Sequence, residues 1–185
     1  MTPKNKSIYQ LKITLQGSKP PIWRRVLVKS DITLAKLHQI IQIAMGWYDS
    51  HLHQFIIDNL YYGVPDPDFD IEIINEQRTK LESVVSRVNQ SFIYEYDFGD
   101  SWEHIILVEK ISAPEPGSNY PICVTGKLAC PPEDCGGIWG YYDLLETLKN
   151  PKDPEYEELL EWVGEDFDPE DFDLELINDQ LKHFA

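Results

Sequence analysis

The sequence lacks any long hydrophobic run. No stretch of its 185 residues approaches the roughly 20 consecutive apolar residues of a membrane-spanning helix. Lysines near the amino terminus are not followed by an apolar segment, so no secretory signal peptide is expected either. The sequence therefore predicts a cytoplasmic protein with no membrane partner.

Cysteine is also scarce. The 3 cysteines, Cys123, Cys130 and Cys135, are an odd number for a chain of this length, which argues against the disulfide framework of a small secreted protein. Free thiols are the expectation for all three. Metal ligation by Cys130 and Cys135, or a disulfide between them, stays open.

Basic residues are few: the chain has 16 Lys and Arg compared with 32 Asp and Glu, and its formal net charge is -16. This deficit excludes a broad nucleic-acid surface, since duplex binding depends on neutralising phosphates. The deficit is uneven, however. Residues 1–50 hold 8 basic and 2 acidic residues, whereas residues 151–185 hold 2 and 13. The pattern indicates two faces of opposite sign and leaves open a local nucleic-acid contact through the basic first quarter.

Apolar and aromatic residues are plentiful by contrast. Hydrophobic residues make up 42% of the chain and aromatic residues 12%, which is too apolar for a disordered protein. The length falls within the usual range of one domain. We therefore expect a single domain over residues 1–185.

The first third of the chain predicts strand, strand, helix and strand in that order. Alternating apolar and polar residues indicate strands over 9–15, 22–29 and 51–58. An amphipathic apolar stripe over residues 34–45 indicates a helix between the second and third strands, which can be capped by Asp31 or Thr33. This order is the beginning of a β-grasp-like fold.

A β-hairpin and three helices are predicted to follow. Residues 92–110 alternate on either side of a turn at 98–101, which is the pattern of a hairpin. The predicted fold class is α+β: a mixed sheet that begins β-β-α-β, extended by this hairpin, with three C-terminal helices packed against it. The remaining predicted segments are loops over 61–70 and 112–137, a short helix around 81–88, and helices over about 138–149, 153–164 and 168–181.

Four segments contain long, unusual strings of residues: Pro21–Phe55, Tyr94–Glu109, Ala129–Pro151 and Trp162–Asn178. Together these segments resemble the plasmid pRiA4b ORF-3-like family, some of whose members are labelled transposon passenger or resolvase-like proteins. The resemblance implies an association with plasmids and mobile elements, and it implies no activity. A serine recombinase needs an activated serine among arginines and a basic DNA-binding module, and this acidic chain shows neither pattern.

Histidines and cysteines are candidate metal ligands. His51 and His53 are two residues apart in a predicted strand, so both side chains would lie on one face, a spacing that can chelate zinc or another divalent ion. His104, Cys130 and Cys135 could complete the site. The alternative is that the histidines lie at the margin of the core and that the cysteines are structural thiols.

Asp97, Asp100 and His104 cluster around the predicted hairpin turn. Two carboxylates and an imidazole there could act as acid, base or metal ligands, which makes these residues candidate catalytic groups. The alternative is local hydrogen bonding, for which turns favour aspartate.

Aromatic and basic residues of the first quarter are candidate binding residues. Arginine beside tryptophan can stack on a base or bind an acidic partner. The alternative is that the arginines pair with the acidic carboxy-terminal region. The candidates are Trp23, Arg24, Arg25 and Trp47 of the first quarter, together with Trp102 of the predicted hairpin.

These observations favour a non-enzymatic binding or accessory module with an unidentified protein partner, because no complete catalytic constellation is present. The alternative function is a metal-dependent enzyme, either a hydrolase or a nuclease-like protein, that uses the His/Asp/Cys cluster.

Overall fold

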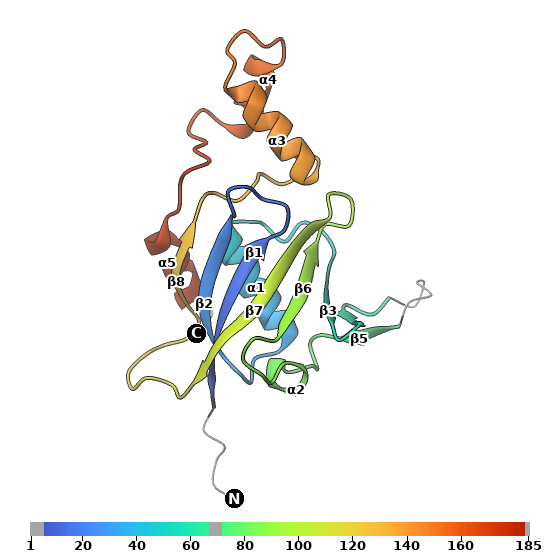
Figure 1. Cartoon of the computed structure of the whole chain (residues 1–185), viewed down its shortest axis with the longest axis vertical. Helices are drawn as coiled ribbons and strands as arrows, with labels where there is room; N and C mark the ends of the chain where they lie inside the picture. The colour runs from blue at the N-terminus through green and yellow to red at the C-terminus, as the bar shows by residue number, and fades with distance from the viewer. Residues whose placement is uncertain (1–5, 67–71, 184–185) are drawn as a thin grey trace, which may run out of the picture.

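One sheet runs through the computed structural model, which describes residues 6–66 and 72–183 (Figure 1). In these ranges the sheet has eight strands in the order β5-β4-β3-β6-β7-β1-β2-β8. Neighbouring strands are antiparallel except β4 and β5. The strands are β1 Ile8–Leu15, β2 Trp23–Lys29, β3 His53–Ile57, β4 Leu60–Gly63, β5 Ile73–Asn75, β6 Ser91–Tyr96, β7 Trp102–Ser112 and β8 Ile122–Lys127.

Five helices accompany the sheet in the described residues: α1 Leu34–Met45, α2 Leu81–Val84, α3 Gly137–Leu148, α4 Tyr156–Val163 and α5 Leu174–Lys182. None of these helices has the length and apolar character that crossing a membrane would require.

The predicted order of strand, strand, helix and strand is confirmed. Thr33 caps α1 by accepting a hydrogen bond from Lys36 N at 3.2 Å, and Gly46 ends the helix in a left-handed conformation with φ 91°. The helix covers one face of the sheet (Figure 1). The β-grasp-like description is not confirmed, because β6 and β7 lie between β1 and β3.

The predicted hairpin is also confirmed as β6 and β7. Its alternation buries one side of each strand, because successive side chains of a strand point to opposite faces. The buried side chains include Phe92, Tyr94 and Tyr96 from β6 and Trp102, His104, Ile106 and Val108 from β7.

Two predicted loops contain strands. Residues 112–137 include β8, which pairs with β2 at the edge of the sheet, and residues 61–70 include most of β4. Both strands are short, and neighbouring turn residues obscure their alternation. The rest of the predicted acidic loop, from residue 67 on, lies outside the described residues.

The last helix begins later than predicted. Asp168 accepts a hydrogen bond from Glu170 N at 2.9 Å, so it shapes a turn and does not cap a helix. Phe172 then packs against the backbone at Gly126, and Asp173 caps α5. Tertiary packing of Phe172 therefore sets where this helix can start.

The three C-terminal helices do not all lie on the sheet. Helix α5 packs against β8 and α1, whereas α3 and α4 pack on each other beyond the end of the sheet (Figure 1). We call residues 137–163 the arm. Its base is attached to the β1–β2 turn, where Ile138 contacts Gly17 and the Tyr142 hydroxyl accepts a hydrogen bond from Lys19 N.

Candidate functional site

Three side chains of the types that bind metal ions lie close together. They lie at the start of β3, at the end of β6 and in the loop before α3. This outer group consists of His51, Asp97 and Asp134, whose ligand atoms lie within 4.8 Å of one another. His51 Nε2 is 3.0 Å from Asp134 Oδ1 and 3.8 Å from Asp97 Oδ2. That nitrogen is shielded from solvent but has no hydrogen-bond partner of good geometry.

The β6–β7 turn holds the Asp97 carboxylate in place. Asp97 has φ 57°, a left-handed conformation that few residues other than glycine adopt. Its Oδ1 accepts hydrogen bonds from Gly99 N at 2.9 Å and from Asp100 N at 3.4 Å. The turn therefore occupies one carboxylate oxygen, and the other faces His51.

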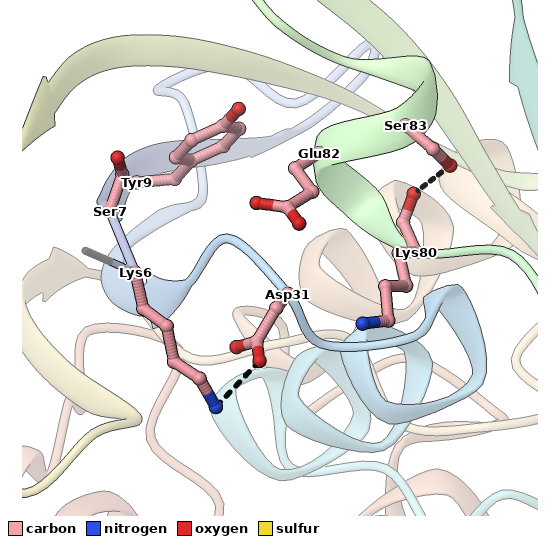
Figure 2. A pocket seen from close by; sticks show the side chains of 7 residues that line it. All are labelled: Lys6, Ser7, Tyr9, Asp31, Lys80, Glu82 and Ser83. Carbon is pink, nitrogen blue, oxygen red and sulfur yellow. Dashed lines mark hydrogen bonds and ion pairs between the residues drawn. The ribbon is translucent and has the colours of Figure 1, made fainter. Parts of the chain in front are cut away.

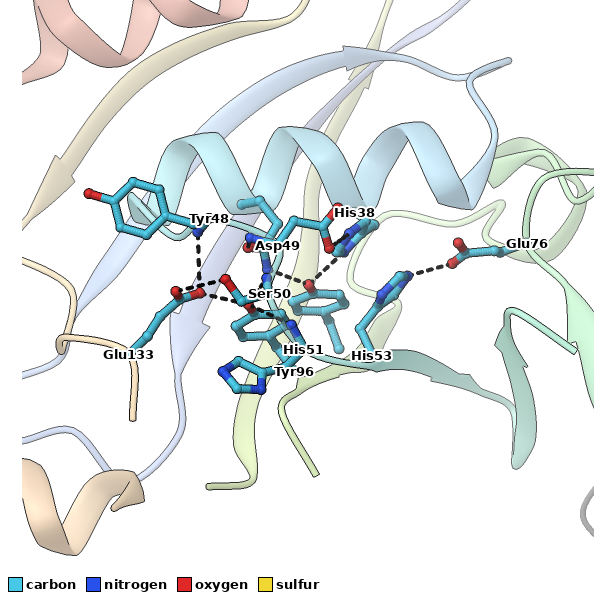
Figure 3. A network of polar contacts seen from close by, with 11 residues as sticks. His38, Tyr48, Asp49, Ser50, His51, His53, Glu76, Tyr96 and Glu133 are labelled. Atoms are coloured by element: carbon cyan, nitrogen blue, oxygen red, sulfur yellow. Dashed lines mark hydrogen bonds and ion pairs between the residues drawn. The ribbon is translucent and has the colours of Figure 1, made fainter. Parts of the chain in front are cut away.

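Glu133 ties the loop before α3 to the sheet (Figure 3). The Tyr96 hydroxyl donates to Glu133 Oε1 at 2.6 Å and accepts from Ser50 N at 2.8 Å. Tyr48 N donates to the same glutamate oxygen at 3.2 Å. Burial and the hydrogen bond to Glu133 raise the pKa of Tyr96, so its hydroxyl remains a donor at neutral pH.

A second polar group, the inner group, lies between α1 and β3 (Figure 3). His38 and His53 stack with ring centroids 3.4 Å apart and planes 1° from parallel. His38 Nε2 bonds Asp49 Oδ1 at 2.8 Å, and His53 Nε2 bonds Glu76 Oε2 at 2.9 Å. His38 Nδ1 bonds the hydroxyl of Tyr94 at 2.8 Å.

The inner group is hydrogen-bonded rather than arranged for a metal. Ligand atoms of His38, Asp49 and His53 lie within 4.8 Å of one another, but an imidazole binds an ion in its ring plane. Two parallel rings cannot share one ion in that way. Burial, with a smaller contribution from the charge of His53, lowers the pKa of His38 to about 4, so this side chain is neutral at pH 7.

The structure separates His104 from the other candidate catalytic residues. Asp97 and Asp100 lie at the β6–β7 turn, whereas His104 points into the core and is 0% exposed. Its Nδ1 donates to Trp102 O at 2.9 Å, and burial lowers its pKa to about 4. Asp100 accepts a hydrogen bond from Gly136 N at 3.1 Å and so fixes the loop before α3.

The candidate metal ligands are also divided. His51 belongs to the outer group and His53 to the inner group, and neither group contains a cysteine. All three cysteines are free thiols. Burial raises the pKa of Cys130 and raises that of Cys135 to about 12. Both thiols are therefore protonated at neutral pH in the metal-free protein.

Arg24, one of the candidate binding residues, is held inside the protein. It is 3% exposed, and its Nε donates to Ala44 O at 2.8 Å. Its Nη1 donates to Trp23 O and to Lys127 O. The guanidinium therefore fastens β2 to α1 and β8, and carbonyl oxygens satisfy it.

Arg25 and Trp23 lie on the face of the sheet that α1 does not cover. Arg25 Nε is 2.6 Å from Glu109 Oε2 of β7, and the pair lowers the pKa of the glutamate. The Lys12 ammonium and the Arg25 guanidinium each lie 5.0 Å from the Trp23 ring centroid. Glu109, and not the acidic carboxy-terminal region, thus pairs with Arg25.

Trp47 and Trp102, the remaining candidates, are buried. They are 7% and 1% exposed, with ring centroids 5.8 Å apart. Trp47 Nε1 donates to Pro131 O at 2.9 Å, so this ring supports the loop that carries the outer group. The exposed tryptophans of the described chain are on the arm: Trp139 is 79% exposed and Trp162 is 48% exposed.

A surface pocket of about 700 Å³ lies at the opposite end of the sheet, beside α2 (Figure 2). Lys6 at its rim pairs with Asp31 at 2.7 Å, and Glu82 accepts a hydrogen bond from Ser30 at 2.7 Å. Its lining contains none of the predicted site residues, and these paired groups offer few free polar atoms to a ligand.

Sequence reasoning did not select His38, Glu76 or Asp134. His38 had a signal, because it lies one turn after Leu34 on the buried side of a predicted amphipathic helix. Glu76 had no such signal in the sequence, because only the pairing of β4 with β5 brings this residue next to His53. Asp134 lies between the two selected cysteines, and only the path of the loop turns it toward His51.

The chain is similar along most of its length to proteins of unknown function. A family model described as plasmid pRiA4b ORF-3-like protein matches residues 7–176. The uncharacterized protein y4hQ of Sinorhizobium fredii is 38% identical over 181 residues, which cover 97% of this chain and 93% of that protein. The crystal structure of MM3350 from Methanosarcina mazei, a protein of unknown function, gives a TM-score of 0.84 at 39% identity, covering 91% of this chain and 96% of that one.

Proposed function

The chain belongs to the plasmid pRiA4b ORF-3-like family, and we propose that it is a non-enzymatic binding module that holds a basic segment of a protein partner on its arm. The observation that carries the proposal is the exposure of two tryptophans among carboxylates. Trp162 lies on α4. Glu158 and Glu161 precede it in the sequence, and further acidic residues follow Gly164. Large exposed aromatic side chains of this kind are typical of interaction surfaces.

Charge complementarity supports a basic partner. Residues 151–185 hold 13 acidic and 2 basic residues, so most of these carboxylates have no cation available within their own segment. Arg24 and Arg25 are engaged by carbonyl groups and by Glu109, and do not neutralise them. A lysine- or arginine-rich partner would be attracted over a distance and held on contact, whereas nucleic acid would be repelled.

The tryptophans would add specificity to this attraction. A cation over the face of an exposed tryptophan contributes about 0.5–1 kcal/mol to the binding free energy, in addition to the contribution from burial of the ring. The arm extends beyond the sheet (Figure 1). Because both tryptophans are exposed, a partner could reach their rings without rearrangement of the core. Basic side chains alternating with apolar ones fit this surface best.

We also propose a cytoplasmic location and an association with mobile elements. The three free thiols support a reducing compartment, and the family description, which refers to a plasmid reading frame, supports the association. A metal-dependent hydrolase is the second candidate function, and the outer group of His51, Asp97 and Asp134 is the observation that favours it.

Site-specific photo-crosslinking in the native host tests the proposal. A photoreactive phenylalanine derivative replaces Trp139 or Trp162, and the same derivative at Ile105 of β7, which is 43% exposed, is the matched control. We expect both arm positions, but not position 105, to cross-link one protein through a peptide rich in Lys and Arg, with a yield that falls as salt is raised. Equal yields from position 105, or an acidic cross-linked peptide, would contradict the proposal.

A further inference from the structure

The outer group has the side chains and the spacing of a metal site. We infer that His51, Asp97 and Asp134 bind one divalent first-row transition ion, with Zn²⁺ and Mn²⁺ as the natural probes. One imidazole nitrogen and two carboxylate oxygens form a mixed ligand set that suits such ions better than it suits thiophilic Cu⁺ or an all-oxygen Ca²⁺ site. The site is separate from the exposed tryptophans of the arm.

The distances between ligand atoms are close to those that an ion requires. Two ligands about 2.1 Å from one ion are about 3.0 Å apart at a right angle and about 3.4 Å apart in a tetrahedron. The two measured separations from His51 Nε2 are 3.0 Å to Asp134 and 3.8 Å to Asp97. The third separation, between the two carboxylates, lies within 4.8 Å, and side-chain rotations would bring all three ligands to coordination distance.

His51 supplies an observation independent of the acidic residues. Its Nε2 is shielded from solvent and has no hydrogen-bond partner of good geometry, although two carboxylates surround it. A buried polar atom left in this way is costly unless a ligand satisfies it. An ion between this nitrogen and the two carboxylates would do so, and it would also relieve the repulsion between the carboxylates.

Neighbouring groups hold the ligands in position. Gly99 N occupies the other oxygen of Asp97 at 2.9 Å, and the His51 ring packs edge-on against Tyr96 at 5.8 Å between centroids. Such supporting contacts orient ligands before an ion arrives. The side chain of Asp134 is 68% exposed, so an ion can enter from solvent and retain water on that side.

The ion would join three segments that are distant in the sequence. His51 precedes β3, Asp97 follows β6, and Asp134 lies two residues before Gly136, the residue that precedes α3. Binding would therefore fix the base of the arm to the sheet. The inner group lacks this capacity because its two parallel rings cannot direct their nitrogens at one ion.

Isothermal titration of the full, chelator-treated protein with ZnCl₂ and with MnCl₂ tests the inference. We expect saturable binding of one ion per chain. Asp134→Asn and His51→Ala should each weaken the affinity by at least about tenfold, as expected for loss of a ligand. Thermal unfolding of each variant without metal checks that the fold is retained, and the exposed position of Asp134 makes Asp134→Asn the safer variant.

Matched controls separate this site from nonspecific binding to an acidic protein. Asp143→Asn removes an exposed carboxylate of α3, and His183→Ala removes an exposed imidazole near the carboxy terminus. Both controls should bind within about twofold of the parent protein. The inference is overturned if neither ion shows saturable binding up to about 1 mM, or if the ligand and control variants lose affinity equally.

Discussion

The inner and outer groups both combine histidine with carboxylates, and His51 of the outer group is two residues from His53 of the inner group, but the groups differ in how their side chains are satisfied. In the inner group His53 has Glu76 at 2.9 Å, and His38 has both Asp49 and the Tyr94 hydroxyl at 2.8 Å. In the outer group the Nε2 atom of His51 has no well-directed partner. Buried polar groups that bond one another stabilise a fold. Trp102 Nε1 and His104 Nε2 in the core also lack partners, so the two neighbouring carboxylates are what mark the His51 nitrogen as a candidate ligand.

The difference extends to the surroundings of each group. Glu76 and His38 are buried, whereas Asp134 is exposed and lies on the loop that leads into the arm. We therefore assign the inner group a role in stability. We assign a role in binding to the other end of the molecule, which carries the outer group and the arm. The two assignments predict opposite responses to substitution.

The largest expected effect on stability comes from Glu76→Ala. Removal of this carboxylate leaves His53 Nε2 without its partner between α1 and β3, and the free energy of unfolding should fall by about 2–4 kcal/mol. Urea denaturation measures the change. Asp134→Asn in the outer group should change it by less than about 0.5 kcal/mol, and equal losses in the two variants would remove the distinction between the groups.

Acid should destabilise the protein through its buried histidines. The pKa values of His38 and His104 fall from 6.5 to about 4 on folding, so between these values the unfolded chain binds more protons than the folded one. Stability is thus present above about pH 6.5 and is lost as the pH falls toward 4, on the order of 1 kcal/mol per pH unit for each histidine.

Urea denaturation at about pH 7 and at about pH 5 measures this slope. His104→Phe should reduce it, and His183→Ala, at an exposed position, should leave it unchanged. A stability that does not change between these pH values would show that neither His38 nor His104 is held neutral by burial.

Metal should stabilise the protein through the outer group alone. An ion present at about 100 times its dissociation constant raises the free energy of unfolding by about 2.7 kcal/mol. Thermal unfolding with and without Zn²⁺ should show this gain in the parent protein and in His183→Ala, and the gain should be absent in His51→Ala. Stabilisation that persists in His51→Ala would place the ion elsewhere.

The smallest expected effect on stability comes from the arm. Trp139 is 79% exposed, so Trp139→Ala should change the free energy of unfolding by less than about 0.5 kcal/mol. Urea denaturation of this variant checks the assignment. A loss above about 2 kcal/mol would mean that the ring packs in the folded protein and is not available to a partner.

The sequence predicted those helices and strands whose formation depends on a local hydrophobic period. The alternation in β1, β6 and β7 and the amphipathic stripe of α1 gave the correct secondary structure, because hydrophobic burial imposes a period on each element. The position of β8 and the delayed start of α5 were not predictable in this way. Both depend on packing between distant segments, such as Phe172 against Gly126.

The candidate site was predicted only in part for the same reason. Asp97 and His51 were selected, but their third partner, Asp134, is brought to them by a loop whose path has no local signature. Likewise, sequence alone did not show which tryptophans are exposed. Trp47 and Trp102 pack against each other inside the protein, while Trp139 and Trp162 remain on the surface of the arm.

The most direct test of the proposed binding surface is the affinity of the cross-linked partner, once purified, for the parent protein and for the Trp139→Ala/Trp162→Ala variant. Fluorescence anisotropy at several salt concentrations gives both dissociation constants. The account predicts at least about tenfold weaker binding by the variant and an affinity of the parent protein that falls as salt is raised. An unchanged dissociation constant in the variant, with no dependence on salt, would contradict it.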